Sequence, residues 1–510
     1  MHIVIIGNGI SGITAARHIR KLSDHQITVI SAETDHFFSR TALMYIYMGH
    51  MRYQDTKPYE DWFWGKNRID LMKDYVKSID FQHKTLELEN NNNLQYDKLI
   101  LAVGSTPNKF GWPGQDLRGV QGLYSYQDLQ GMEHYSEGLQ HAVIVGGGLI
   151  GIEMAEMFHT RNIPVTFLVR EGSYWNAVLP PEESEMINRH ILDNHIDLRL
   201  KTELKEILSD ENGRARAVIT NTGEEIACGF VGLTAGVRPN TGFLKDSGLE
   251  IGRGILVNEH LETNIPDVYA IGDCAQARNP LPSRRPVEAI WYTGRMMGET
   301  VAYNICKGPV AYDPGIWFNS AKFFDIEYQV YGTVLAKAPD HHKSIYWEHP
   351  EGKLSVRVIY DENDETILGF NLMGVRFRHE VCEKWVADKT PVQTVLRDLS
   401  LAHFDPEFYT TYQEKLIETY RQQSGETIIA NQKGVDQVAY FLGNNDRPAA
   451  AYKSRGQIIL GVGLLLLLIG LALPFTVPVD GLIMMTSGFG VAAGLALILM
   501  GATNIRAARV

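Results

Sequence analysis

The feature that most constrains the fold is a strand–glycine–helix pattern that occurs twice in the chain. In the first copy, HIVIIGNGISGITAARHI, the apolar run Ile3–Ile6 has the length of a buried strand, a GxGxxG motif follows it, and a helical pattern begins at once. The second copy, HAVIVGGGLIGIEMAEMF, is built in the same way. The six motif glycines are Gly7, Gly9, Gly12, Gly146, Gly148 and Gly151.

Each glycine of such a motif has its own physical task. One permits a tight turn, one lets the backbone approach a pyrophosphate, and one lets helix and strand pack closely, so that the phosphates lie at the positive end of the helix. A single GxGxxG is a weak signal, but two copies that each join a strand to a helix predict two Rossmann-like domains. The strand QITVISAE ends in Glu33, whose carboxylate can accept hydrogen bonds from ribose hydroxyls.

Composition limits the other classes. The 510 residues suffice for three or four domains, and 45% hydrophobic with 21% charged residues is globular composition. The formal net charge of -12 argues against a nucleic-acid binder. The four cysteines form no CxxC, which excludes a zinc ribbon, a cysteine-ligated iron–sulfur cluster and a CxxC redox centre, and fits a reducing compartment. Because a strand begins at the second residue, we expect no signal peptide and a cytoplasmic location for the bulk of the chain.

With three further segments, the two motifs resemble the pyridine nucleotide–disulfide oxidoreductase superfamily, the flavoproteins with two dinucleotide domains. YDKLILAVGS, with Gly104, is similar to the end of the first FAD segment, LTAGVRPNT to the end of the NAD(P) domain, and TNIPDVYAIGDCAQ to the second FAD fingerprint. The resemblance covers about residues 1–310 and implies FAD in the first cradle and NAD(P)H in the second. Asp273 would then hydrogen-bond the ribityl chain of FAD.

The resemblance also implies an α/β fold with a discontinuous FAD domain, residues 1–114 and 246–312, interrupted by an NAD(P) domain, residues 115–245. Glu153 matches a position that helps to hold the nicotinamide carboxamide, and its alternative is a first-turn glutamate that interacts with the helix dipole. Arg170 matches a position that binds a 2′-phosphate, whereas Glu171 could bind a ribose. This leaves NADPH slightly favoured over NADH.

The segment DHFFSRTALMYIYMGH contains no cysteine, although disulfide reductases of the superfamily carry a redox cysteine there. Thiol–disulfide chemistry needs a thiolate at the flavin, so those activities are disfavoured. FSRTAL instead resembles the cysteine-free branch of rubredoxin and ferredoxin reductases and the flavin portion of nitrite reductase. By this resemblance Ser39 and Arg40 lie by the FAD, and Arg40 has the alternative of a surface arginine.

RRPVEAIWYTGRMMGETVAYNI is similar to the helix that closes the flavin site, which makes Glu288 a catalytic candidate, like Glu153, and Trp291 a neighbour of the isoalloxazine ring. Core packing is the alternative for Trp291. Residues 313–425 resemble, more loosely, the α+β interface domain of the ferredoxin-reductase branch. This resemblance implies that the domain forms a dimer interface or binds a partner protein. SVRVIYDENDETILGFNLMG predicts a hairpin, and VCEKWVADKTPVQTVLRDL predicts helix. No histidine cluster has metal-ligand spacing, so we expect no metal site, and the adjacent His341 and His342 are expected to be solvated.

The end of the chain differs from the rest. After a polar linker, residues 426–455, the runs Ile458–Phe475 and Leu482–Ala502 carry no charge, and both are long enough for a bilayer that takes about 20 helical residues. We therefore predict a transmembrane helical hairpin at 456–503, with a buried soluble helix pair as the alternative. The basic residues lie on both flanks and none lies in the loop, so the positive-inside rule puts both ends in the cytoplasm.

These observations predict a membrane-anchored FAD-dependent NAD(P)H oxidoreductase on the cytoplasmic face of the cell membrane. Three accounts of its acceptor remain open. The acceptor is a membrane-associated redox protein, which the interface domain favours, or a quinone, which the membrane tail favours, or the chain is an FAD-containing scaffold subunit of a membrane assembly. A soluble small-molecule substrate is a fourth, weaker account.

Overall fold

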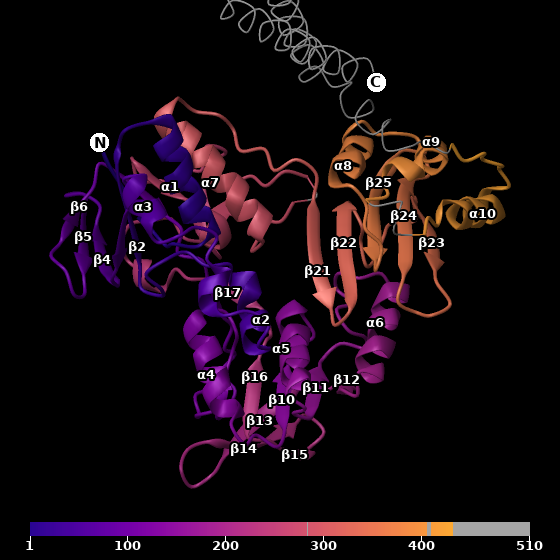
Figure 1. The fold of residues 1–510 in the computed structure, drawn as a ribbon, viewed down its shortest axis with the longest axis horizontal. Coiled ribbons are helices and arrows are strands. Elements are labelled where there is room, and N and C mark those ends of the chain that lie inside the picture. The colour runs from indigo at the N-terminus through magenta and orange to yellow at the C-terminus, as the bar shows by residue number, and fades with distance from the viewer. Residues whose placement is uncertain (283, 405–409, 432–510) are drawn as a thin grey trace, which may run out of the picture. The chain divides into compact units, whose positions relative to one another are not determined.

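The computed structural model describes residues 1–282, 284–404 and 410–431, and these form two compact units (Figure 1). The first unit comprises residues 1–339, 348–356 and 371–375. The second comprises residues 340–347, 357–370 and the described residues from Arg376 onward. Both glycine motifs lie in the first unit, which contains two sheet-based modules.

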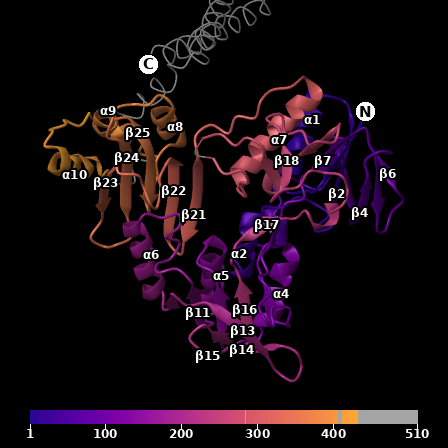
Figure 2. The ribbon, with the colours of Figure 1, turned by 180° about the vertical axis from the view of Figure 1, so that it is seen from behind.

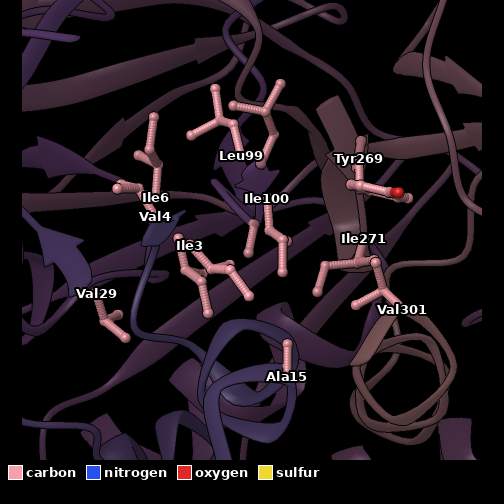
Figure 3. Packing of buried hydrophobic residues seen from close by; sticks show 14 of the residues in the cluster. Ile3, Val4, Ile6, Ala15, Val29, Leu99, Ile100, Tyr269, Ile271 and Val301 are labelled. Carbon is pink, nitrogen blue, oxygen red and sulfur yellow. The ribbon is translucent and has the colours of Figure 1, made fainter. Parts of the chain in front are cut away.

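The first module is built on a five-stranded parallel sheet with the order β19-β7-β1-β2-β3. Its strands are β1 (His2–Ile6), β2 (Gln26–Ser31), β3 (Asp70–Lys73), β7 (Lys98–Leu101) and β19 (Val268–Ala270). The central strands are apolar on both faces, as a parallel sheet covered on both sides requires. Figure 3 shows the resulting core, in which Ile3, Ile100 and Val301 are fully buried.

The helices α1 (Ile10–Leu22) and α7 (Trp291–Cys306) lie side by side, although they are far apart in the sequence (Figures 1 and 2). The close approach depends on Gly298, because a Cβ atom there would lie 2.6 Å from the backbone oxygen of Ser11. The module also contains an antiparallel sheet and short helices. These are β4 (Val76–Asp80), β5 (Thr85–Leu88), β6 (Leu94–Gln95), η1 (Arg40–Ala42), α2 (Leu43–Tyr47), η2 (Tyr53–Thr56), α3 (Trp62–Lys66) and η4 (Gly272–Cys274).

The second module repeats the parallel architecture with the order β12-β11-β10-β16-β9. Its strands are β9 (Val120–Gln121), β10 (Ala142–Val145), β11 (Val165–Val169), β12 (Asp197–Leu200) and β16 (Phe230–Leu233). Its helices are α4 (Tyr126–Ser136), α5 (Leu149–Thr160) and α6 (Pro181–Asp193). A three-stranded antiparallel sheet completes it, formed by β13 (Leu204–Ser209), β14 (Ala215–Thr220) and β15 (Glu225–Ala227).

The chain enters and leaves the second module through adjacent strands. β8 (Ser105–Pro107) and β17 (Val237–Pro239) pair antiparallel, with Ser105 opposite Pro239. The returning chain forms η3 (Gly242–Leu244) and β18 (Ile255–Val257), adds β19 to the edge of the first sheet, and then forms β20 (Ala275–Ala277), which pairs parallel with β18. The first module is therefore made of two separate stretches of sequence, as the family resemblance implies.

The hairpin of β21 (Phe318–Phe323) and β22 (Ile326–Gly332) falls in the first unit, and its place in the predicted third domain, residues 313–425, stays a prediction. Its buried side chains Phe323 and Tyr328 pack in the same core as the second module. The hairpin also carries Lys322, whose Nζ lies 2.7 Å from the Glu156 carboxylate on α5. Packing against α5 and α6 thus ties this hairpin to the second module.

The second unit contains most of three strands and, within its described residues, the helices that follow them. The strands are β23 (His342–Glu348), β24 (Ser355–Asp361) and β25 (Ile367–Met373), of which residues 348, 355–356 and 371–373 belong to the first unit. The helices are α8 (His379–Ala387), α9 (Val392–Arg397), η5 (Leu399–Leu401) and α10 (Gln413–Ser424). β24 and β25 are neighbours in their sheet, which confirms the predicted hairpin. The segment predicted to be helical, residues 381–399, contains two helices: Lys389 takes a positive φ of 50° between them, and Pro391 caps α9.

The predicted membrane hairpin, residues 456–503, lies outside the described residues. Among the residues that the structure describes, no helix has both the length and the apolar composition needed to cross a bilayer.

Candidate functional site

A cavity of about 640 Å³ lies in the first unit, within the size range of small-molecule sites. Its walls come from loops at the carboxyl ends of the parallel strands of the first module, from the start of α7, and from the first turns of α5 in the second module. The predicted site residues on its walls are Gly7, Gly9, Glu33, Arg40, Gly104, Glu153, Asp273 and Trp291. Residues separated by more than 280 positions thus meet in one site.

The first cradle shows a separate role for each of its three glycines. Gly7 has a φ of +114° and a Cβ there would lie 2.1 Å from the Ala102 backbone oxygen. A Cβ on Gly12 would lie 2.0 Å from the Gly7 oxygen, so Gly12 is needed for packing and is not on the cavity wall. A Cβ on Gly9 would meet no atom within 4 Å, which leaves room for a ligand at the backbone.

The start of α1 has backbone N–H groups that can bind an anion. Gly9 is its N-cap, and no side chain caps the first N–H groups. Free N–H groups at a helix start, together with the helix dipole, bind phosphate. The residues of the cavity therefore fit the pyrophosphate of a dinucleotide.

Glu33 and Arg40 form a tight ion pair on the cavity wall. Arg40 donates two hydrogen bonds to the Glu33 carboxylate, at 2.9 and 2.6 Å, and the backbone N–H of Tyr126 donates a third at 2.9 Å. The pair fixes the orientation of the Glu33 carboxylate at the end of β2. Arg40 is thus not a free surface arginine, whereas Ser39 does not line the cavity and lies 3.1 Å from the Thr41 hydroxyl.

Tyr124 connects several of the predicted residues, and sequence reasoning missed it. Its hydroxyl accepts a hydrogen bond from the Ser105 backbone N–H at 2.8 Å and donates to Asp273 at 3.2 Å. Its ring lies 4.6 Å from the Arg40 guanidinium carbon. The hydroxyl also lies 2.8 Å from where a Cβ on Gly104, with its φ of +66°, would stand. No motif identifies this tyrosine, because its partners come from three distant segments.

Asp273 is held in this network at the start of η4. Burial raises the pKa of its carboxyl group, and the hydroxyl of Tyr124 and the charge of Arg40 partly offset that effect. The side chain faces the cavity, as a hydrogen-bonding partner for a polar chain of a bound ligand requires.

The second cradle repeats the geometry of the first. Gly146 has a φ of +117°, and a Cβ there would lie 2.8 Å from the Ala235 backbone nitrogen. A Cβ on Gly151 would lie 2.5 Å from the Gly146 oxygen, whereas one on Gly148 would meet no atom within 4 Å. Gly148 is the N-cap of α5 and no side chain caps that helix, so a second anion site is prepared here.

The loop after β11 carries Arg170 and Glu171, the two charged residues predicted to bind the nucleotide. The guanidinium of Arg170 donates to the Glu171 carboxylate at 2.8 and 3.1 Å, and the Arg170 side chain is 70% exposed. Val169 is fully buried and offers no polar group. Lys201 lies beside the same loop, with its Cε 3.5 Å from a Cβ placed on Gly172. Lys201 is a second cation that the sequence motif did not reveal.

Glu153 lies on α5, the helix of the second cradle, and its side chain lines the cavity of the first module. Burial raises the pKa of its carboxyl group from 4.5 to about 7, and the neighbouring Glu156 carboxylate adds to that rise. Lys322 opposes the rise, while it forms its ion pair with Glu156. Glu153 can therefore change its protonation state near neutral pH.

The start of α7 forms another part of the wall, with Ala289, Ile290 and Trp291. Trp291 is 36% exposed, so simple core packing does not describe it. Glu288 does not line the cavity: Arg284 donates to it at 2.7 and 2.6 Å, and both side chains are more than 90% buried. The hydroxyl of Thr293 also donates to Glu288, at 3.2 Å. This pair anchors the loop in front of α7.

No cysteine lines the cavity. Of the four cysteines, all within the described residues, Cys228, Cys274 and Cys382 are buried and Cys306 is partly buried. Burial raises the pKa of the Cys274 thiol to about 12. A thiolate for disulfide chemistry is therefore not provided at this site.

Two dinucleotide cradles, with the helix of the second contributing to the cavity of the first, define an oxidoreductase with two dinucleotide-binding modules. The comparisons agree. The chain belongs to the pyridine nucleotide-disulphide oxidoreductase family, whose model matches residues 1–298. The protein is accordingly an FAD-dependent oxidoreductase that uses NAD(P)H.

Among similar proteins, the nitrite reductase [NAD(P)H] of Bacillus subtilis (strain 168) is 29% identical over 280 residues, which is 54% of this chain and 34% of that protein. The nitric oxide reductase FlRd-NAD(+) reductase of Salmonella schwarzengrund (strain CVM19633) is 30% identical over 302 residues, 58% of this chain and 79% of that protein. The chain thus spans only about a third of the first relative. The crystal structure of NADH:rubredoxin oxidoreductase from Clostridium acetobutylicum shares the fold, with a TM-score of 0.61 at 23% identity, over 78% of this chain and 98% of the other.

Proposed function

We propose that this protein is a membrane-anchored NAD(P)H oxidoreductase that passes electrons through FAD to a membrane-associated redox protein. The observation that carries the proposal is that, among the residues that the structure describes, no cysteine lines a cavity whose residues fit a dinucleotide. Electrons that reach such a site have no disulfide to reduce within the chain, so they leave to an external acceptor.

The residues of the cavity would hold FAD in a definite way. The N–H groups at the start of α1 and the open backbone at Gly9 would receive the pyrophosphate, and Glu33, fixed by Arg40, would receive a ribose. Asp273 and Tyr124 would bind the polar chain between the phosphates and the ring. When bound, FAD accepts a hydride from the nicotinamide nucleotide and releases electrons to the acceptor.

The chain's own contribution is binding, alignment and exclusion of water. Leu149 and Ile150 give the wall apolar side chains where α5 meets the cavity. Glu153, on the same helix, is placed to hold the nicotinamide carboxamide. Its raised pKa lets it bind as a neutral acid or as a carboxylate near pH 7. Glu288 does not reach the cavity, so it is not a catalytic residue, and its ion pair with Arg284 stabilises the loop before α7.

For the nucleotide, the loop after β11 supports NADPH. Arg170 and Lys201 place two cations beside the position where a ribose phosphate would lie, and the buried Val169 offers no carboxylate to a 2′-hydroxyl. A guanidinium binds phosphate well. Glu171 is the opposing group, since its carboxylate could bind the free ribose of NADH once Arg170 releases it.

A protein acceptor is supported by relatives whose names describe electron transfer to other redox proteins, the FlRd-NAD(+) reductase and the NADH:rubredoxin oxidoreductase. Anchoring rests on the sequence of residues 456–503, two uncharged runs with basic residues on both flanks. The anchor would hold the reductase at the cytoplasmic face, where NAD(P)H is available. Quinone reduction is the second candidate, and the observation that favours it is the same pair of apolar runs.

Anaerobic stopped-flow of the detergent-purified full chain tests the redox part. NADH or NADPH is mixed with the protein, and the flavin absorbance near 450 nm is followed. The reduced protein then meets either a purified one-electron iron–sulfur protein or a short-chain quinone in a second mixing step. We expect rapid bleaching with NADPH, faster than with NADH, and reoxidation by the iron–sulfur protein at a higher rate than by quinone.

If the quinone reoxidises the flavin promptly and the iron–sulfur protein does not, the protein is a quinone reductase and the proposal of a protein acceptor is wrong. If neither NADH nor NADPH bleaches the flavin, the protein is not a reductase, and the account of an FAD-containing scaffold subunit remains. The membrane topology is tested separately in intact cells. The variant is Asp480→Cys, because Asp480 lies in the loop between the two uncharged runs, which the positive-inside rule puts outside the cell. Labelling by a membrane-impermeant maleimide from outside is expected, and a Ser424→Cys variant, on α10, serves as the control that stays unlabelled.

A further inference from the structure

Three side chains with metal-ligating atoms come together in the second unit. They are His341, His342 and Asp361, and one ligand atom from each lies within 4.8 Å of the others. Two adjacent histidines do not have metal-ligand spacing, so the sequence predicted no metal site here. The carboxylate that completes the group comes from about twenty residues further along the chain.

The sheet brings these residues to one place. His342 is the first residue of β23 and Asp361 is the last residue of β24, and the two strands are neighbours. The backbone N–H of Glu362 donates to the His341 oxygen at 2.8 Å, which fixes the two chain segments to each other. The cluster therefore rests on strand ends, which are more rigid than a free loop.

The polar atoms of the cluster are not satisfied by one another. Asp361 Oδ1 accepts from the backbone and side-chain nitrogens of Asn363, both at 2.8 Å, whereas Oδ2 lies 3.9 Å from His341 Nε2, too far for a hydrogen bond. Nδ1 of His342 is buried and has no partner. A buried nitrogen without a partner costs free energy unless a further group binds it.

The two imidazole rings of the cluster are neighbours, with 4.6 Å between the ring centroids of His341 and His342. The nearby Lys343 ammonium is held by Glu362 at 3.2 Å.

We propose that His341, His342 and Asp361 bind one divalent ion of the late first transition series, with Zn²⁺ as the representative. Two imidazoles and one carboxylate suit this class, whereas Mg²⁺ and Ca²⁺ prefer oxygen ligands. With metal–ligand bonds of about 2.0–2.2 Å, ligand atoms in a tetrahedral site lie roughly 3.4 Å apart. The cluster therefore closes by up to roughly 1.5 Å, which rotation of the half-exposed His341 ring can supply.

The test uses the full chain, purified in detergent with its FAD and without a histidine tag, and then dialysed against a chelator. ZnCl₂ is titrated by calorimetry, and Co²⁺ is titrated in parallel by its visible absorption. We expect one saturable site per chain. His341→Ala and Asp361→Asn should each weaken it by about tenfold or more, because each removes a ligand.

His83→Ala is the matched control, since His83 is an exposed histidine that is hydrogen-bonded to Asp80 at 2.7 Å and has no second histidine beside it. This variant should bind Zn²⁺ like the unmodified chain. The proposal is overturned if the chain shows no saturable Zn²⁺ site, or if His341→Ala binds as tightly as the His83→Ala control. Because the His341 side chain is 46% exposed, its replacement leaves the fold in place.

Discussion

Replacing Glu153 by glutamine should stabilise the protein, and the gain should be larger at alkaline pH than in acid. Burial raises the pKa of this carboxyl group from its ordinary 4.5 to about 7 in the folded chain. Between these two values the folded state binds more protons than the unfolded state. The free energy of unfolding therefore falls as pH rises through this window, and the full cost of the buried charge is present above pH 7. Glutamine has a similar shape and carries no charge at any pH.

The size of the effect follows from the two pKa values. A difference of one pKa unit corresponds to about 1.4 kcal/mol, so the rise from 4.5 to about 7 corresponds to about 3 kcal/mol. Linkage then gives a gain for Glu153→Gln of about 3 kcal/mol at pH 8 and about 1 kcal/mol at pH 5. Urea denaturation of the FAD-free chain, followed by tryptophan fluorescence at both pH values, measures the two differences.

Glu137→Gln provides the control, because Glu137 is an exposed glutamate at the end of α4. It should change the free energy of unfolding by less than about 0.5 kcal/mol at either pH. If Glu153→Gln gave the same gain at pH 5 as at pH 8, or no gain at all, Glu153 would not be a buried carboxyl group with a raised pKa, and the account of its protonation near pH 7 would be refuted.

Three other changes probe the site. Tyr124→Phe removes the hydroxyl that bonds Ser105 and Asp273, so the FAD dissociation constant should rise about tenfold; an unchanged constant in equilibrium dialysis would exclude Tyr124 from FAD binding. Gly148→Ala adds a methyl group to open space, so KM for the nucleotide should rise at least about tenfold while the flavin content stays constant, and equal losses of both would point to misfolding. Arg284→Met leaves a buried carboxylate unpaired and should cost about 3–5 kcal/mol in urea denaturation; a loss below about 1 kcal/mol would contradict the buried ion pair.

Local chemistry explains what the sequence predicted well. The roles of Gly7, Gly9 and Gly12 follow from a turn of a few residues, so their spacing suffices to place them, and the same holds for the second cradle. The segment 381–399 shows the limit of such reasoning. Its apolar pattern is helical throughout, but the pattern does not reveal that Lys389 takes a positive φ and ends the first helix before Pro391 caps a second one.

Contacts between distant segments account for what the sequence did not predict. Tyr124 and Lys201 belong to no motif, and only folding brings them to the nucleotide cradles. Glu288 shows the opposite case, since its position near the start of α7 suggested a role in the cavity. Arg284, four residues earlier, holds its carboxylate behind the wall instead. A one-dimensional pattern identifies a side chain with the right chemistry and does not say which partner it will meet.

The two-part construction of the first module has a consequence for synthesis on the ribosome. The parallel sheet of the second module comes from a single stretch of sequence, which is complete once β16 has left the ribosome. The first module begins at residue 2 but lacks β19 and α7 until about residue 306 has been made. Until then, the edge of β7 and the face of α1 that α7 covers stay exposed. The part of the chain that is made first is therefore completed last, and a chaperone that binds nascent chains would find its target there.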